Sequence, residues 1–274
     1  GSDGLGTSSI GGLRRIWDIN RQYRQKKKQE SRSRQLALES EHAALASTLS
    51  ELEGTDNYHH WIFQQLSPYL HGSILEVGAG TGTFTRHLER SDLRVIAAEP
   101  DPQLFELLMT SFSESPSIAV IHADDQSKAL NRYAPFDCIA LVNVLEHIRH
   151  EAQTAQRLYE LLQPGGYLLI WVPAHNYLYS RFDRDIGHHR RYSVPMMRSL
   201  LLSIGFQIVD VRYRNPVGAF AWMIVAKFGR TRPTIASLSK AYDRYVIPLQ
   251  SRSKIAANPP FGQSILAIAR KPMT

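Results

Sequence analysis

The sequence has very few cysteines and no long apolar runs. Of its 274 residues only Cys138 is a cysteine, and no stretch reaches the roughly 18 apolar residues that a membrane-spanning helix needs. A single thiol cannot form an internal disulfide, and Cys138 lies in an apolar segment, so we expect an inert thiol in the core of a cytoplasmic protein. Residues 1–12 are polar and rich in glycine and serine, so no secretory leader is visible.

Glycine and proline are absent from residues 13–53, and this composition favours helix. We expect a disordered tail over residues 1–12, a helical N-terminal extension over 13–56 and one large domain over 57–274. The extension carries an apolar stripe that a single helix cannot bury. We therefore expect it to act as a lid or to mediate a homo-oligomer, with packing on its own core or on a membrane surface as alternatives.

The net positive charge is concentrated in one segment of this extension. The net charge is +7, and residues 14–34 hold nine Lys/Arg against Asp18 and Glu30, which accounts for the whole excess. An enzyme that acts on nucleic acid should carry basic residues on its active face. We therefore expect no nucleic-acid partner, and keep a nucleic-acid or membrane-surface binding module that uses this arm as the alternative.

A glycine-rich turn is the strongest local signal. A short apolar strand, Ile74–Val77, leads through residues 78–82 into a predicted helix that begins at Phe84. Such a turn is typical of nucleotide-cofactor binding. A dinucleotide turn would place its third glycine where Thr83 stands, and Glu76 would repel a pyrophosphate but attract a sulfonium and an ammonium. The turn therefore favours S-adenosylmethionine (SAM) over NAD.

Apolar strands and helical segments alternate along the rest of the chain. The predicted strands are residues 74–77, 93–98, 118–122, 136–142, 167–172, 206–213 and 264–269. This alternation predicts a doubly wound α/β domain with a parallel sheet. An aromatic insert, partly helical, is expected over residues 215–261.

These motifs together resemble those of a known family. They are Ile74–Gly82, Ala98–Pro100, Ala123–Asp124, Phe136–Asp137, Asn143–Ile148 and Leu162–Gly166. In this order and spacing they resemble class I SAM-dependent methyltransferases over about residues 57–271. The resemblance implies a Rossmann-like fold with a seven-stranded, mostly parallel sheet, helices on both faces, and a last strand inserted antiparallel beside the fifth.

Two further segments are similar to narrower groups. The segment Asp183–Tyr192 is similar to the GHxRRY-like segment of a bacterial subgroup in glycan and natural-product pathways. The N-terminal arm and the aromatic insert resemble natural-product C-methyltransferases of the teleocidin type, which methylate a prenyl alkene. Substrates of such enzymes are diverse, so these matches narrow the class and not the substrate.

The resemblance implies a SAM site, with S-adenosylhomocysteine (SAH) as the product. Glu99 would hold the ribose, Asp124 the adenine with Asp125 as its solvent-facing neighbour, and the glycine turn and Asn143 the methionine portion. The predicted cofactor residues are Tyr58, Trp61, Glu76, Gly78, Ala79, Gly80, Thr83, Glu99, Pro100, Asp124, Asn143 and Val144. Tyr58 and Trp61 could instead only pack a helix onto the sheet.

A hydroxyl acceptor would benefit from a general base near the methyl group. His147 follows the fourth strand and His188 and His189 follow the fifth, and each could instead make a structural hydrogen bond. We expect no catalytic metal. His147 and His150 are one helical turn apart beside Glu146, but no further ligand set is evident.

An alkene acceptor would need aromatic walls to stabilise a carbocation. The candidate substrate-binding residues are Tyr23, Trp171, Tyr177, Tyr179, Phe182, Phe220 and Trp222, with core packing as the alternative. The arginines of residues 181–191 could bind an acidic substrate or pair with Asp183 and Asp185. We expect a small-molecule partner, either a fairly apolar natural product methylated at carbon or oxygen or a glycan-linked hydroxyl, and no stable membrane insertion.

Overall fold

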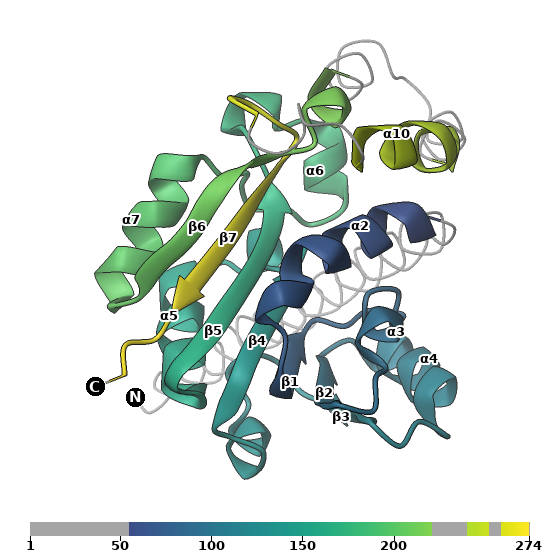
Figure 1. Ribbon diagram of the computed structural model, residues 1–274, viewed down its shortest axis with the longest axis vertical. Helices are drawn as coiled ribbons and strands as arrows, with labels where there is room; N and C mark the ends of the chain where they lie inside the picture. The colour runs from purple at the N-terminus through teal and green to yellow at the C-terminus, as the bar shows by residue number, and fades with distance from the viewer. Residues whose placement is uncertain (1–54, 221–239, 252–258, 274) are drawn as a thin grey trace, which may run out of the picture. The chain divides into compact units, whose positions relative to one another are not determined.

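The computed structural model describes residues 55–220, 240–251 and 259–273 (Figure 1). The predicted tail, nearly all of the helical extension, Tyr23 and Trp222 lie outside these residues. Within them, no helix is long and apolar enough to cross a membrane.

Seven strands and the helices between them make up the described domain. The strands are β1 (Gly72–Val77), β2 (Leu93–Glu99), β3 (Ile118–His122), β4 (Phe136–Val142), β5 (Leu162–Pro173), β6 (Gln207–Arg214) and β7 (Ser264–Arg270). The α-helices are α2 (Asp56–Leu66), α3 (Thr85–Leu88), α4 (Pro102–Phe112), α5 (Glu151–Leu161), α6 (Arg181–Asp185), α7 (Val194–Ile204) and α10 (Ile247–Ser251). Single turns are η1 (Ser67–Tyr69), η2 (Lys128–Arg132), η3 (Leu145–His147), η4 (Asn176–Leu178) and the π-helix η5 (Tyr242–Val246).

The strands form one sheet in the order β3-β2-β1-β4-β5-β7-β6. The first five strands pair in parallel, and β7 runs antiparallel between β5 and β6 (Figure 1). This confirms the predicted mostly parallel, seven-stranded sheet with its inserted last strand. The carboxyl ends of β1, β2, β4 and β5 therefore meet at one edge, where ligands bind in folds of this kind.

Each face of the sheet carries its own apolar core. One core packs residues of α2, α3, α4 and α10 against the sheet, and the other packs residues of α5 and α7 against the opposite face. Because both faces are covered, the central strands are apolar along their length. In β7, for example, only the last residue, Arg270, is not buried.

Two local expectations differ from the structure. The helix predicted to begin at Phe84 begins one residue later, at Thr85, and has four residues because Glu89 leaves the helical conformation. The strand predicted over residues 167–172 begins earlier, at Leu162 directly after α5, so the Pro-Gly-Gly segment belongs to β5.

Candidate functional site

The glycine turn follows β1 and is fixed to the end of β2. The amides of Gly78 and Ala79 both donate to the carbonyl oxygen of Ala98, at 2.8 and 3.1 Å. Gly78 has a φ of 68°, and a Cβ at this position would lie 2.8 Å from Cγ2 of Val144. The turn therefore requires glycine both for its left-handed backbone and for its close approach to the loop after β4.

Glu99 closes the turn from the end of β2. Its side chain is buried and accepts hydrogen bonds from the amides of Gly80 at 2.8 Å and Asp101 at 2.9 Å. Burial raises the pKa of Glu99, and the two amide bonds oppose that shift. The carboxylate thus sits at the turn in the place from which the predicted ribose contact would be made.

Glu76 is the second carboxylate at this edge, and its surroundings differ. It is buried in β1, and its Oε2 has no hydrogen-bond partner among the described residues. Burial raises the pKa of Glu76 to about 8. A buried carboxylate oxygen without a donor costs free energy, which a cationic ligand would offset. The donor set therefore fits the ammonium of SAM.

Asn143 directly follows β4, just as the glycine turn directly follows β1. It adopts a φ of 54°, which is uncommon for a residue other than glycine, and its amide donates to Trp171 O at 2.8 Å. Strained backbone of this kind clusters at ligand sites, where the surrounding structure holds it in place. Its position beside Gly78 and Val144 is where the predicted contact with the methionine portion of SAM would form.

A pocket of about 540 Å³ lies at the ends of β2 and β3, lined by Pro100, His122, Ala123, Asp124, Gln126 and Ser127. Asp124 is exposed and faces this pocket, as the predicted adenine contact requires. Asp125 was expected to face solvent, and here the structure differs. It is half-buried and accepts a 2.6 Å hydrogen bond from Thr154 of α5, so it ties the loop to that helix.

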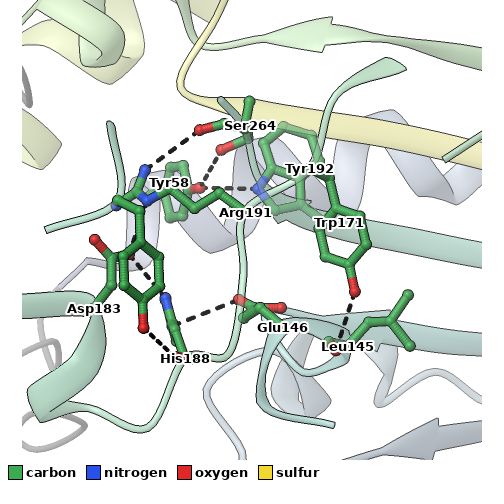
Figure 2. Close-up of polar contacts among 11 residues, drawn as sticks. Tyr58, Leu145, Glu146, Trp171, Asp183, His188, Arg191, Tyr192 and Ser264 are labelled. Atoms are coloured by element: carbon green, nitrogen blue, oxygen red, sulfur yellow. Dashed lines mark hydrogen bonds and ion pairs between the residues drawn. The ribbon is translucent and has the colours of Figure 1, made fainter. Parts of the chain in front are cut away.

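Tyr58 and Trp61 of α2 lie against the sheet with Trp171 of β5. The indole of Trp171 donates to Tyr58 Oη at 2.9 Å (Figure 2). The Trp61 and Trp171 rings meet edge-on with centroids 5.5 Å apart. Trp171 has no exposed surface, and Trp61 is 3% exposed. Trp171 therefore supports Tyr58 from the core in this arrangement. Cofactor contact by Tyr58 and Trp61 stays a prediction.

The aromatic insert fixes the start of α2. The carboxylate of Asp243, in the π-helix η5, accepts the amide hydrogens of Tyr58 at 2.7 Å and Asn57 at 3.3 Å. A carboxylate at this position satisfies amides that a helix N-terminus leaves unpaired and is favoured by the helix dipole. The insert thereby holds the helix that carries Tyr58.

A compact cluster of Glu146, His147 and His188 lies beyond Asn143. Their ligand-type atoms all lie within 4.8 Å of one another, and the two histidine rings meet edge-on with centroids 4.6 Å apart. Glu146 has no exposed surface, and neither of its carboxylate oxygens has a hydrogen-bond partner among the described residues. Its Oε1 lies 3.8 Å from His188 Nε2 (Figure 2).

Burial has opposite effects on the acid and the base of this cluster. It raises the pKa of Glu146 to about 7. It lowers the pKa of His147 to about 3, with a further contribution from the neighbouring His188. His147 is therefore a neutral imidazole at physiological pH. As a general base it would be weak, and that predicted role stays untested.

Asp183 holds His188 from the other side. Its Oδ1 lies 3.0 Å from His188 Nδ1 and accepts a hydrogen bond from Arg191 Nε at 2.8 Å (Figure 2). Its Oδ2 accepts hydrogen bonds from the amide and the hydroxyl of Ser180. Burial raises the pKa of Asp183, but the hydrogen bond from His188 and the charge of Arg191 outweigh it and bring the pKa to about 2. The ionised carboxylate thus fixes the orientation of the His188 ring.

The two adjacent arginines of the GHxRRY-like segment, Arg190 and Arg191, pair with acidic residues of the chain. Arg191 pairs with Asp183, and Arg190 lies 2.7 Å from Glu151. The sequence allows these arginines either to bind an acidic substrate or to pair within the chain, and in the structure Arg190 and Arg191 pair within the chain. His189 is exposed, and its amide donates to Glu146 O, so the segment is also tied to η3 through the backbone.

The remaining predicted substrate residues are spread out. Tyr179 donates to the carbonyl of His188 at 2.6 Å and is half-buried, as is Phe182. Tyr177 is 76% exposed, and Phe220 is 53% exposed and meets Phe261 edge-on. Tyr179 and Phe182 are thus the two that lie in the segment of the histidine cluster, and the substrate contacts of all four stay predictions.

Glu146 and Asp183 were not among the site residues predicted from the sequence. Glu146 adjoins His147 in the Asn143–Ile148 motif, so its position directly after β4 is the signal that could have identified it. The contact between His147 and His188 joins residues 41 positions apart, and no local spacing indicates it. The nearby His150, the partner suggested by helical spacing, is exposed at the start of α5.

Comparison with known proteins agrees with this architecture. A family model described as a methyltransferase domain matches residues 22–211, more than half of the chain. A ubiquinone biosynthesis O-methyltransferase of Xylella fastidiosa is 31% identical over 102 residues, which cover 35% of this chain and 40% of the relative. A hybrid PKS-NRPS synthetase of Emericella nidulans is 32% identical over 110 residues, 37% of this chain and 3% of the synthetase. The chain thus matches less than half the length of these relatives.

Solved structures support the fold. A SAM-dependent methyltransferase from Archaeoglobus fulgidus matches with a TM-score of 0.57 and 16% identity, over 82% of this chain and 99% of that one. The sheet order, the glycine turn with its two carboxylates and the family match agree with one another. The chain belongs to the methyltransferase-domain family and carries a SAM-dependent methyltransferase domain.

Proposed function

We propose that the protein transfers the methyl group of SAM to a small, fairly apolar metabolite, at a hydroxyl oxygen in preference to a carbon. SAM supplies an electrophilic methyl group on a sulfonium. The chain's own residues bind it through the glycine turn, Glu76 and Glu99, and orient the acceptor at the ends of β4 and β5.

The observation that carries this proposal is the local charge balance beside the cofactor residues. Arg190 and Arg191 pair with Glu151 and Asp183 at 2.7 and 2.8 Å. An enzyme for a polyanionic acceptor would aim unpaired cations at its substrate. Here Arg190 and Arg191 are engaged within the chain, which favours an uncharged acceptor.

Oxygen is favoured over carbon by the side chains present. A carbocation formed on an alkene would need aromatic faces around it, but Trp171 is fully buried and Tyr177 is 76% exposed. Glu146, His147 and His188 provide polar groups suited to a hydroxyl. The names of the two relatives, a ubiquinone biosynthesis O-methyltransferase and a PKS-NRPS synthetase, both refer to the biosynthesis of small molecules. This similarity supports a small-molecule acceptor.

Isotope transfer tests the proposal. The protein is incubated with SAM that carries a deuterated methyl group and with an extract of the producing cells, and small-molecule, protein and nucleic-acid fractions are read by mass spectrometry. We expect one labelled small product, with fragmentation placing the label on oxygen. Glu99→Ala serves as the cofactor-site control. Label found only on protein or nucleic acid would contradict the proposal, and would support the basic residues 14–34 as a macromolecule-binding arm.

A further inference from the structure

The cluster of Glu146, His147 and His188 has the composition of a metal site. Two imidazoles and one carboxylate are a common donor set for zinc and neighbouring divalent ions, and three protein ligands leave positions open for a substrate. The donor atoms lie within 4.8 Å of one another. Around tetrahedral zinc such atoms are about 3.4 Å apart, so the three side chains would move closer together around an ion.

The buried carboxylate of Glu146 provides a second and independent observation. Both of its oxygens are buried and lack hydrogen-bond partners among the described residues, and one faces His188 Nε2 at 3.8 Å. Buried carboxylates are paired or coordinate metals in folded proteins. A cation held between Glu146 and the histidines would satisfy both oxygens.

The surroundings of His188 are those of a metal ligand. Metal-binding histidines usually donate their other ring N–H to a carboxylate, which fixes the tautomer and the ring orientation. Asp183 Oδ1 lies 3.0 Å from His188 Nδ1, and Arg191 and Ser180 fix Asp183 in turn. With Nδ1 protonated toward Asp183, the lone pair of Nε2 points toward Glu146 and is available to an ion.

We propose that Glu146, His147 and His188 bind one divalent transition-metal ion, and that this ion receives the acceptor hydroxyl. The proposal rests on the proposed function and narrows its substrate to hydroxyl compounds that can bind a metal. The ion would favour loss of the hydroxyl proton to water. The oxygen would then form the new C–O bond as the S–CH₃ bond breaks, which leaves neutral SAH.

Metal titration of the full chain tests the site. The protein is freed of metal with a chelator and titrated with ZnCl₂ by calorimetry, and with CoCl₂ by visible absorption, where Co²⁺ bound to nitrogen and oxygen ligands gives d–d bands. We expect one ion per chain and a Co²⁺ spectrum of low coordination number.

Matched variants assign the ligands. Glu146→Gln keeps the side-chain volume, and we expect it, His147→Ala and His188→Ala each to weaken Zn²⁺ binding at least about tenfold, since loss of even an outer partner costs 10–100-fold. His150→Ala is the control, because His150 is exposed and outside the cluster. It should bind Zn²⁺ as the wild type does. Thermal unfolding shows whether each variant is folded.

Three results would overturn the proposal: no uptake of Zn²⁺ or Co²⁺ by folded protein, unchanged binding in folded Glu146→Gln, or equal loss in His150→Ala. Each would leave His188 as a structural link between Asp183 and Glu146. SAH binding to the metal-free protein separates this outcome from failure of the proposed function. If SAH binds and label transfer proceeds in chelator, the methyltransferase proposal stands without the metal.

Discussion

The two halves of the ligand-binding edge are built in different ways. At β1 and β2, the Glu99 carboxylate accepts hydrogen bonds from the backbone amides of Gly80 and Asp101, and the three residues lie within 22 positions of one another in the sequence. At β4 and β5, the loop that carries Glu146 and His147 meets a segment about 40 residues later, and Asp183 and Arg191 hold that segment in place. The cofactor half therefore depends on local backbone geometry, whereas the acceptor half depends on a long-range polar network.

Because the acceptor half depends on this polar network, we expect removal of the Asp183 carboxylate to lower the folding stability of the protein. Asp183→Asn takes the ionised partner from buried Arg191, and breaking a buried pair in this way costs roughly 3–5 kcal/mol. Asp185→Asn is the matched control, because its ion pair with Arg181 is exposed at 3.9 Å and should cost less than about 1 kcal/mol. Urea unfolding measures both. Equal effects would show that the network does not stabilise the acceptor half.

The buried Glu76 should make the stability of the cofactor half depend on pH. Its folded pKa of about 8 exceeds the ordinary carboxyl value of 4.5, so its contribution to stability is fully present below about pH 4.5 and is lost as pH rises through 8. Relative to Glu76→Gln, the wild type should lose roughly 5 kcal/mol over this range, at about 1.36 kcal/mol for each pKa unit of the shift. The free energy of unfolding of both proteins is measured against pH without ligand. Parallel curves would contradict the buried, unpartnered state of Glu76.

Glu99 tests the cofactor half alone. Glu99→Ala removes the carboxylate that closes the glycine turn, and we expect SAH affinity to fall at least about tenfold, as expected for one lost charge-assisted group. Glu106→Gln, on the exposed face of α4, should leave the affinity unchanged. Calorimetry compares the two variants. Unchanged SAH affinity in Glu99→Ala would remove Glu99 from the predicted ribose site.

Substitution of Tyr58 should have the smallest effect on stability. Tyr58 lies in α2 and accepts a hydrogen bond from Trp171 of β5. Tyr58→Phe leaves the buried indole N–H of Trp171 without its acceptor and should cost about 1 kcal/mol. Tyr177→Phe is the control, because Tyr177 is 76% exposed. Thermal unfolding measures the difference. A Tyr58→Phe protein as stable as the control would mean that the hydrogen bond contributes little to the packing of α2.

The same contrast explains how much could be predicted from the sequence. Strand periodicity and the glycine turn predict the sheet and place Glu76, Glu99 and Asn143 at one edge, because parallel strands bring their carboxyl ends together. The partnership of His147 with His188 could not be predicted, since it depends on how the segment after β5 folds back. Likewise, the core position of Trp171 follows from packing against α2, which aromatic composition alone does not reveal.

Calorimetric titration of SAH into Glu146→Gln, beside the wild type, tests the division between the halves most directly. Glu146 belongs to the acceptor half, so we expect SAH affinity within about twofold of the wild type, as for a substitution outside the cofactor site, together with loss of label transfer to the acceptor. A loss of SAH affinity as large as that expected for Glu99→Ala would contradict the division into two halves, because Glu146 would then belong to the cofactor site.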